Sequence, residues 1–242
     1  MKSNCTKALL VVALFSIAMG LLESSVVIYL RELYYPDGFN FPLKSIPFKI
    51  SIVELNRELA TIIMLWGIAY MSGKNKTERF AYFCFAFAIW DIFYYIFLYV
   101  FISWPESIFT WDLLFLLPYP WVGPVWAPVL ISLLMLVSSA IYLKKVEKDK
   151  SFQIKKIWWF VTFSGAFICI LSFLWDYFQL THFSLNTLDT LSPTKNSEFI
   201  FQYVPQKFNF LLFFTGFFAM LTAVLFQFTN PLKTRKNEKE NR

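Results

Sequence analysis

The chain has 242 residues, of which 57% are hydrophobic and only 16% are charged, a composition far more apolar than that of an ordinary soluble domain. The mean hydropathy of +0.53 and the 21% aromatic content exclude a disordered chain and a coiled coil. With one histidine and three cysteines, we expect no metal site and leave the cofactors unknown. The composition predicts an integral membrane protein.

Six segments are long and apolar enough to cross about 30 Å of hydrocarbon as helices. They are residues 8–30, 52–71, 80–102, 122–143, 157–177 and 208–228. A further apolar stretch, 105–117, opens with the helix-start signal of Pro105 and Glu106 but is too short to span, which predicts a short interfacial or re-entrant helix. We therefore expect an all-α fold: a polytopic membrane helix bundle forming one transmembrane domain over 1–229, followed by a polar cytoplasmic tail over 230–242.

The distribution of lysine and arginine predicts the orientation. Sixteen of the 22 lie in the N-terminal tail, the 72–79 and 144–156 loops and the C-terminal tail, and five lie in the alternate loops. Because such residues stay on the cytoplasmic side in short loops, we expect a multi-pass protein of the cell (inner or plasma) membrane with both termini in the cytoplasm. The basic pI of 9.1 follows from this asymmetry, and no nucleic-acid partner is expected.

The first span has a second interpretation. Two lysines precede an apolar run that contains Ala18-Met19-Gly20, which fits the cleavage site of a signal peptide. The apolar run continues to Leu30, beyond the length of a signal peptide's apolar region, and this favours a helix that stays in the membrane.

Charged residues inside the spans are the main functional signal, because each costs about 2.5–3.5 kcal/mol unless it has a partner or a role. Counting about 1.5 Å per residue from the nearest cytoplasmic lysine or arginine puts Glu23 and Glu58 at about 24 Å and Asp91 at about 18 Å. We predict that these three carboxyl groups converge on one cavity between the first three spans and are the acid–base candidates. Arg57, at about 26 Å, is expected to pair with a carboxylate and to bind an anionic group.

Four other residues are candidate binding residues. Tyr94 and Tyr95 share a helix face with Asp91, so they are expected to line the same cavity. Asp112 and Glu106 lie on the predicted short helix, where they would close the cavity from outside.

Several of these residues also have purely structural interpretations. Ser51 and Glu54 fit a capping box at the start of the second span. Arg57 fits an ion pair between helices, and Asp91 would be satisfied by one Tyr or Ser hydroxyl from a neighbouring helix.

The first outer loop, residues 31–42, contains the turn signal Pro36-Asp37-Gly38 between aromatic residues. We expect this loop to be ordered, as a lid or as packing. Arg31 at its start is interpreted as a charge at the membrane end of the first span.

A string of motifs runs through the middle of the chain. It comprises Trp90-Asp91-Ile92-Phe93-Tyr94-Tyr95, Trp104-Pro105-Glu106-Ser107, Thr110-Trp111-Asp112 and Pro118-Tyr119-Pro120-Trp121-Val122-Gly123-Pro124. The stretch that contains it, about a third of the chain, resembles a group of bacterial multi-spanning membrane proteins of unassigned function. The resemblance implies a membrane-spanning fold and carries over no catalytic or binding residue.

Three functions fit the sequence. The leading one is a membrane-embedded enzyme or binding protein, whose carboxylate, tyrosine and arginine site in the outer half of the bilayer takes a small or lipid-linked polar substrate. A proton- or cation-coupled transporter would use the same acids as coupling sites. An accessory subunit would use the charges as contacts between helices. In each case the lipid bilayer is a partner, and the oligomeric state stays open.

Overall fold

The structure of the protein, a computed structural model, describes residues 2–115, 120–187 and 203–229, so the predicted tail over 230–242 lies outside the described residues. The helices are α1 (Lys2–Tyr34), α2 (Phe48–Ser72), α3 (Lys76–Ile102), α4 (Trp126–Lys148), α5 (Lys156–Thr187) and α7 (Phe210–Thr229). A single antiparallel hairpin of β1 (Trp111–Phe115) and β2 (Trp121–Pro124) accompanies them in the described part of the chain. The helical fold class is confirmed.

Five of the helices contain a stretch long and apolar enough to cross a membrane: α1, α3, α4, α5 and α7. This supports a multi-pass membrane protein. The predicted second span, 52–71, falls within α2, but α2 carries Glu54, Arg57 and Glu58 and does not reach the same apolar content. The charges of α2 set it apart from the other five helices.

The predicted short helix over 105–117 is wrong for the residues that the structure describes. Residues 106–110 form bends and turns, and Trp111–Phe115 is a strand. The first residues of the predicted fourth span belong to strand β2 of this hairpin, so α4 begins at Trp126 instead of residue 122. The physical reason is pairing: Asp112 lies opposite Gly123, and Leu113 lies opposite Val122, so the two short apolar runs satisfy each other's backbone groups.

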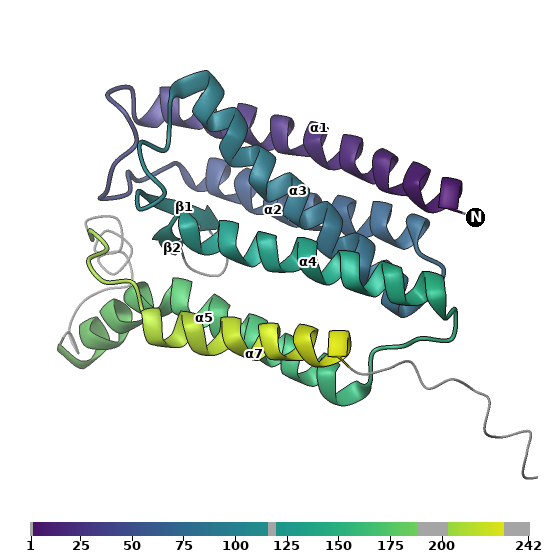
Figure 1. Ribbon diagram of the computed structural model, residues 1–242. Coiled ribbons are helices and arrows are strands. Elements are labelled where there is room, and N and C mark those ends of the chain that lie inside the picture. Colours follow the sequence, from purple (N-terminus) through teal and green to yellow (C-terminus); the bar gives the residue numbers. More distant parts are fainter. Residues whose placement is uncertain (1, 116–119, 188–202, 230–242) are drawn as a thin grey trace, which may run out of the picture.

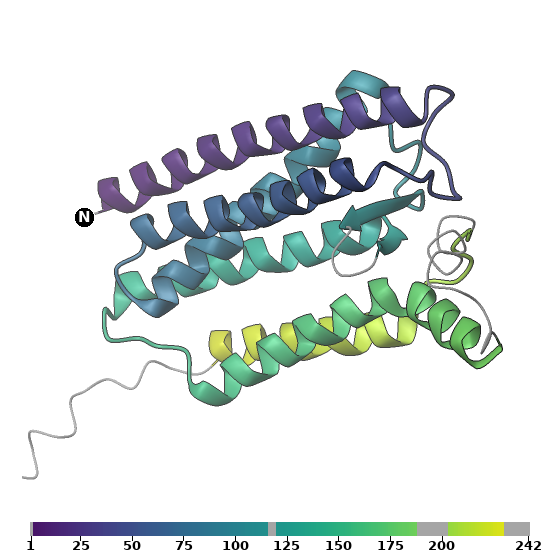
Figure 2. The same ribbon diagram turned by 180° about the vertical axis from the view of Figure 1, so that it is seen from behind.

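The helices form a group of four and a pair. α3 lies at the centre of the first group and packs against α1, α2 and α4, while α5 and α7 pack against each other (Figure 1). The view from behind shows α5 and α7 as a separate layer below the other helices (Figure 2). β2 contacts both α4 and α5, so the hairpin joins the two groups.

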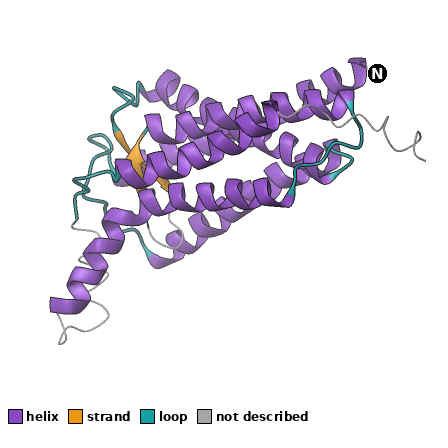
Figure 3. Cartoon of the chain, turned by 60° about the horizontal axis from the view of Figure 1, so that its bottom comes forward, coloured by secondary structure: helices purple, strands orange, loops and turns teal. Residues whose placement is uncertain are grey.

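The two ends of this bundle differ. The hairpin lies at one end together with the loops that follow α1 and α3, and the N-terminus lies at the other (Figures 1 and 3). We call these the hairpin end and the N-terminal end. The N-terminal end also holds the α2–α3 loop and the α4–α5 loop, which are two of the lysine- and arginine-rich segments.

Two glycines allow α5 and α7 to approach closely. A Cβ added to Gly216 would lie 2.5 Å from the Gly165 carbonyl oxygen, and one added to Gly165 would lie 2.7 Å from that of Gly216. Small residues at a crossing point are typical of helix pairs in membranes. Around this crossing, the largest apolar core joins α4, α5 and α7 through residues such as Leu134, Phe173 and Phe213.

Candidate functional site

The buried charged residues lie toward the hairpin end of α1, α2 and α3 and in the hairpin itself. We call the following set the polar cluster: Glu23 and Arg31 on α1, Glu54, Arg57 and Glu58 on α2, Asp91, Tyr94 and Tyr95 on α3, and Asp112 on β1. Seven of these nine residues were predicted as site residues from the sequence. The contacts within the cluster divide it into three groups.

The first group is built around Arg57. Its guanidinium pairs with Glu23 across the α1–α2 contact and with Glu54 one turn away, where Nη2 lies 2.7 Å from Oε2. The Thr61 hydroxyl lies 3.1 Å from the other oxygen of Glu23. The prediction that Arg57 is held by a carboxylate is confirmed, and the structural alternative of an ion pair between helices describes the same contact.

This group also corrects the predicted capping role of Glu54. α2 begins at Phe48 with Pro47 at its N-cap, so Ser51 and Glu54 already lie inside the helix. Proline suits the start of a helix because the first backbone N–H groups have no hydrogen-bond partner within the helix, so the N–H that proline lacks is not missed. Glu54 is therefore free to pair with Arg57.

The second group joins Arg31 to the hairpin. Arg31 Nη2 lies 3.1 Å from Oδ1 of Asp112, and the Tyr95 hydroxyl lies 3.2 Å from the other carboxylate oxygen. The Arg31 guanidinium stacks over the ring of Trp104 at 3.7 Å and faces the ring of Phe39 at 4.6 Å. One arginine of α1 thus contacts the loop after α1, the segment after α3 and β1.

Asp112 is 1% exposed and lies in the hairpin, outside the membrane-spanning helices. Burial raises the pKa of its carboxyl group to about 6, against the opposing effects of Arg31, the Leu113 backbone N–H at 2.9 Å and the Tyr95 hydroxyl. Desolvation therefore outweighs the charge of its arginine partner.

The third group is smaller. The Ser132 hydroxyl of α4 donates to Oδ2 of Asp91 over 2.8 Å, and both residues are buried. The structural alternative for Asp91, a single hydroxyl from a neighbouring helix, therefore holds.

Tyr94 lies between the groups. It interacts electrostatically with Asp112 and Arg31 of the second group and with Glu23 and Arg57 of the first. The backbones of α1 and α3 come close here, since a Cβ on Gly20 would lie 2.9 Å from the Trp90 carbonyl oxygen. The three groups therefore belong to one region of the bundle.

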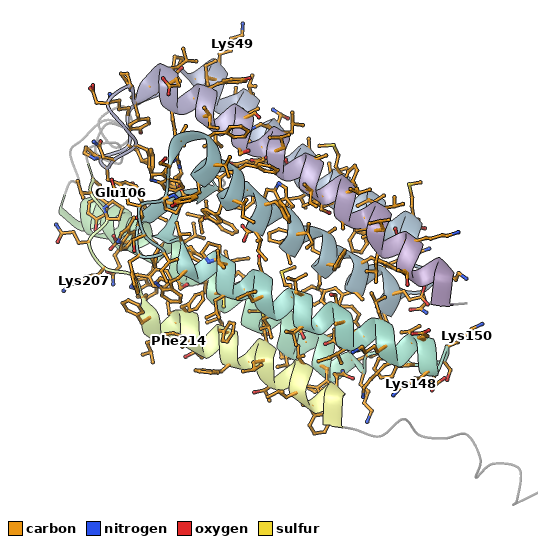
Figure 4. The ribbon with its side chains drawn as sticks, turned by 45° about the horizontal axis from the view of Figure 1, so that its top comes forward. Lys49, Glu106, Lys148, Lys150, Lys207 and Phe214 are labelled. Atoms are coloured by element: carbon orange, nitrogen blue, oxygen red, sulfur yellow. The ribbon has the colours of Figure 1, made fainter. Side chains whose placement is uncertain are left out.

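Of the two remaining predicted residues, one is buried and the other is exposed. Glu58 is buried on α2 beside Arg57. Glu106 is exposed at the hairpin end (Figure 4), and the turns around it replace the short helix that was expected to aim it inward. The convergence of Glu23, Glu58 and Asp91 on one cavity stays a prediction, because Glu23 faces α2 whereas Asp91 faces α4.

Sequence reasoning missed the role of Arg31, which it treated as a membrane-end charge. It also missed Ser132 and Thr61, the hydroxyls beside Asp91 and Glu23. The signal that favours Arg31 is the aromatic loop after α1, which is ordered as predicted: Phe39 lies 5.1 Å from the ring of Tyr35 and covers the guanidinium.

Several buried hydrogen-bond donors at the hairpin end have no partner among the described residues. They are Arg31 Nη1, Trp90 Nε1, Trp121 Nε1 and the Tyr177 hydroxyl. An unpaired buried donor costs about 1–3 kcal/mol, so a gathering of such groups calls for a physical reason. Three of them, those of Arg31, Trp90 and Trp121, lie on α1, α3 and β2.

The donor set suits organic polar groups better than a metal ion. Within residues 2–115, 120–187 and 203–229, no group of three or more His, Cys, Asp or Glu side chains could hold a metal ion. Guanidinium, indole and phenol groups donate hydrogen bonds to oxygen atoms such as those of carboxylates, phosphates and sugars.

Comparison with protein-family models, with curated proteins and with solved structures finds no match to this chain.

Proposed function

We propose that the protein crosses the cell membrane six times, with α2 spanning it in addition to the five apolar helices, and that both termini lie in the cytoplasm. The lysine- and arginine-rich segments support this orientation, and it puts the hairpin end on the outer side. α2 is less apolar than the other helices because it contains Glu54, Arg57 and Glu58, but Arg57 pairs with Glu54 and with Glu23 of α1, which lowers the cost of holding these charges in the membrane.

We propose further that the polar cluster is a binding site for a small or lipid-linked polar ligand, in an enzyme or a binding protein. The observation that carries this proposal is Arg31: its side chain is 10% exposed, yet Nη1 has no hydrogen-bond partner in the described structure. Asp112 occupies Nη2 and leaves Nη1 for an acceptor oxygen. The rings of Trp104 and Phe39 fix the plane of the guanidinium, so the direction of Nη1 is set before a ligand arrives.

The test is to identify what remains bound to the protein after mild purification from its own membranes. Extracts of the wild type and of Arg31→Gln are compared by mass spectrometry. Lys44→Gln, which replaces an exposed lysine between α1 and α2, is the matched control. We expect a compound that carries carboxylate, phosphate or sugar oxygens to be enriched with the wild type and the control and lost from Arg31→Gln. Identical extracts from all three proteins would contradict the proposal.

The orientation is tested separately by cysteine labelling with an impermeant reagent. Cysteines introduced near Asp37 and Asn186 are expected to react in intact cells, and those near Asn75 and Lys148 are not. Of the three natural cysteines, Cys84 and Cys169 are buried and free and give little background, and Cys5 is replaced by serine before labelling. A reversed pattern would move the polar cluster to the cytoplasmic side.

A second candidate function rests on the charge balance of the cluster. It contains five carboxyl groups and two guanidinium groups, and this excess of acids would be offset by bound protons or cations in a coupled transporter. In proteoliposomes with a trapped pH indicator, a transporter would move protons across the membrane, and Asp91→Asn would stop that movement. Pyranine fluorescence that stays constant in a pH gradient would remove this candidate.

A further inference from the structure

A second site candidate lies at the N-terminal end of the bundle, away from the polar cluster. α1 and α4 each pack against α3, and between them a groove of about 390 Å³ opens with Phe85 of α3 in its lining. Leu9 of α1 and Leu136, Ala140 and Leu143 of α4 form its sides. The groove is lined mainly by apolar side chains and is open along one side.

One end of the groove is charged. Lys144 lines it, and Glu147 and Thr6 lie beside it. Lys148, at the end of α4 and marked in Figure 4, is exposed but does not line the groove. Lys144 and Glu147 carry opposite charges in the lining, the exposed Lys7 follows Thr6 on α1, and the apolar wall of α4 begins at Leu143 beside Lys144.

The groove has the length of one leaflet. From Leu136 to Lys144 the α4 axis rises by about 12 Å at 1.5 Å per residue, against a half-thickness of about 15 Å for the hydrocarbon core. An apolar groove of this length with a lysine at its surface end matches the acyl chain of a lipid that runs inward from its charged head group. Basic pockets between helices on the cytoplasmic side bind lipid head groups by this arrangement.

We propose that this groove binds an anionic glycerophospholipid, with one acyl chain along Phe85, Leu136 and Ala140 and the phosphate beside Lys144. The assignment to the cytoplasmic leaflet rests on the proposed orientation of the chain. The positions of the acyl chain and the phosphate are inferred only from the residues that line the groove. This lipid site is separate from the ligand site around Arg31.

The test is native mass spectrometry of the purified protein in detergent, titrated with dioleoylphosphatidylglycerol or with dioleoylphosphatidylcholine. We expect the anionic lipid to bind more tightly. Lys144→Gln should weaken its binding about fivefold, as expected for the loss of one lysine beside an anionic lipid. Ala140→Phe, which puts a ring into the groove at an exposed position, should remove binding of both lipids.

Matched controls come from the same helix. Lys148→Gln removes an equal charge, and Leu133→Phe adds a ring at another exposed position, and neither residue lines the groove. Both controls should bind the anionic lipid as the wild type does. If Ala140→Phe lowers the folded yield, Lys144→Gln against Lys148→Gln decides the question.

Three results would overturn the proposal. These are equal binding of the two lipids, equal losses in the variants and their controls, and a dimer that Ala140→Phe dissociates, which would make a second copy of the chain the occupant. The binding is measured in detergent and does not depend on orientation. Its failure is therefore distinguishable from a failure of the topology or of the Arg31 site.

Discussion

Replacing Arg57 with glutamine removes a group that binds both Glu23 on α1 and Glu54 on α2. The side chains of these two acids are 12% and 6% exposed, so each would lose its cation in a mostly apolar surrounding. Breaking a buried ion pair by removing one partner costs about 3–5 kcal/mol. Because the Arg57 side chain is 22% exposed, we expect a loss at the lower end of that range, about 3 kcal/mol.

The assay is thermal unfolding in detergent micelles, followed by the fluorescence of the nine tryptophans. For a chain of this size each kcal/mol changes Tm by roughly 2–4 °C, so Arg57→Gln should lower it by about 6–12 °C. Lys49→Gln is the control, since Lys49 is an exposed residue near the start of the same helix (Figure 4). The control should change the free energy of unfolding by less than about 0.5 kcal/mol.

A double variant separates the ion pair from other effects of Arg57. When Glu23→Gln and Arg57→Gln are combined, the loss should be smaller than the sum of the single losses by about 0.5–3 kcal/mol, the usual coupling of residues in contact. The reasoning is refuted if Arg57→Gln behaves like Lys49→Gln, or if the two losses add without coupling.

Three further predictions use the same unfolding assay. Gly216→Ala should destabilise the protein by about 1–3 kcal/mol through overpacking at the α5–α7 crossing, whereas Gly67→Ala, where an added Cβ meets open space, should be neutral or stabilising. Ser132→Ala should cost about 1–3 kcal/mol by removing the hydroxyl that donates to Asp91; no loss would mean that this bond is not needed. The folded-state pKa of Asp112 is raised to about 6, above its unfolded value, so its contribution to stability is fully present below about pH 4 and decreases by about 3 kcal/mol as the pH rises through 6. Asp112→Asn should remove that part of the pH dependence, and an unchanged pH profile would contradict the assignment.

The sequence predicted the helices well because their signal is local. A run of about 20 apolar residues has few alternatives to a spanning helix, and five such helices are present. Counting residues along each helix also puts Glu23 and Arg57 at similar depth, and the two pair. Depth is a one-dimensional property, so it can be obtained from the chain alone.

The hairpin was missed because its signal is not local. The apolar run before Pro118 is too short to be assigned by periodicity, and short apolar runs are ambiguous between helix and strand. Most of its partner strand, Trp121–Pro124, falls at the start of the predicted span 122–143. The Pro and Gly residues around Gly123 were the available evidence for a break.

Rotation about each helix axis was the other missing quantity. Their positions in the same half of the bilayer made Glu23 an expected neighbour of Asp91, but α3 presents Asp91 to Ser132 of α4. Neighbours across a helix interface depend on how three helices pack together, and one sequence contains no direct signal of that packing. Depth therefore limited the possible partners of each acid without selecting among them.

The lack of packing information in the sequence also explains why no role was predicted for Arg31. The position of Arg31 also indicates which parts of the chain the proposed function depends on. An arginine at the end of a span ordinarily extends its head group to water, which is why the sequence suggests no role for it. Here Phe39 of the aromatic loop and Trp104 of the segment between α3 and β1 cover the guanidinium, and the hairpin supplies Asp112. Stacking on aromatic rings contributes about 0.5–2 kcal/mol per contact, enough with the Asp112 pair to favour the inward position. The ligand-binding capacity proposed for the hairpin end therefore depends on the two connecting segments, and changes in residues 35–47 or 103–125 should affect it more than changes in the lipid-facing surface of the helices.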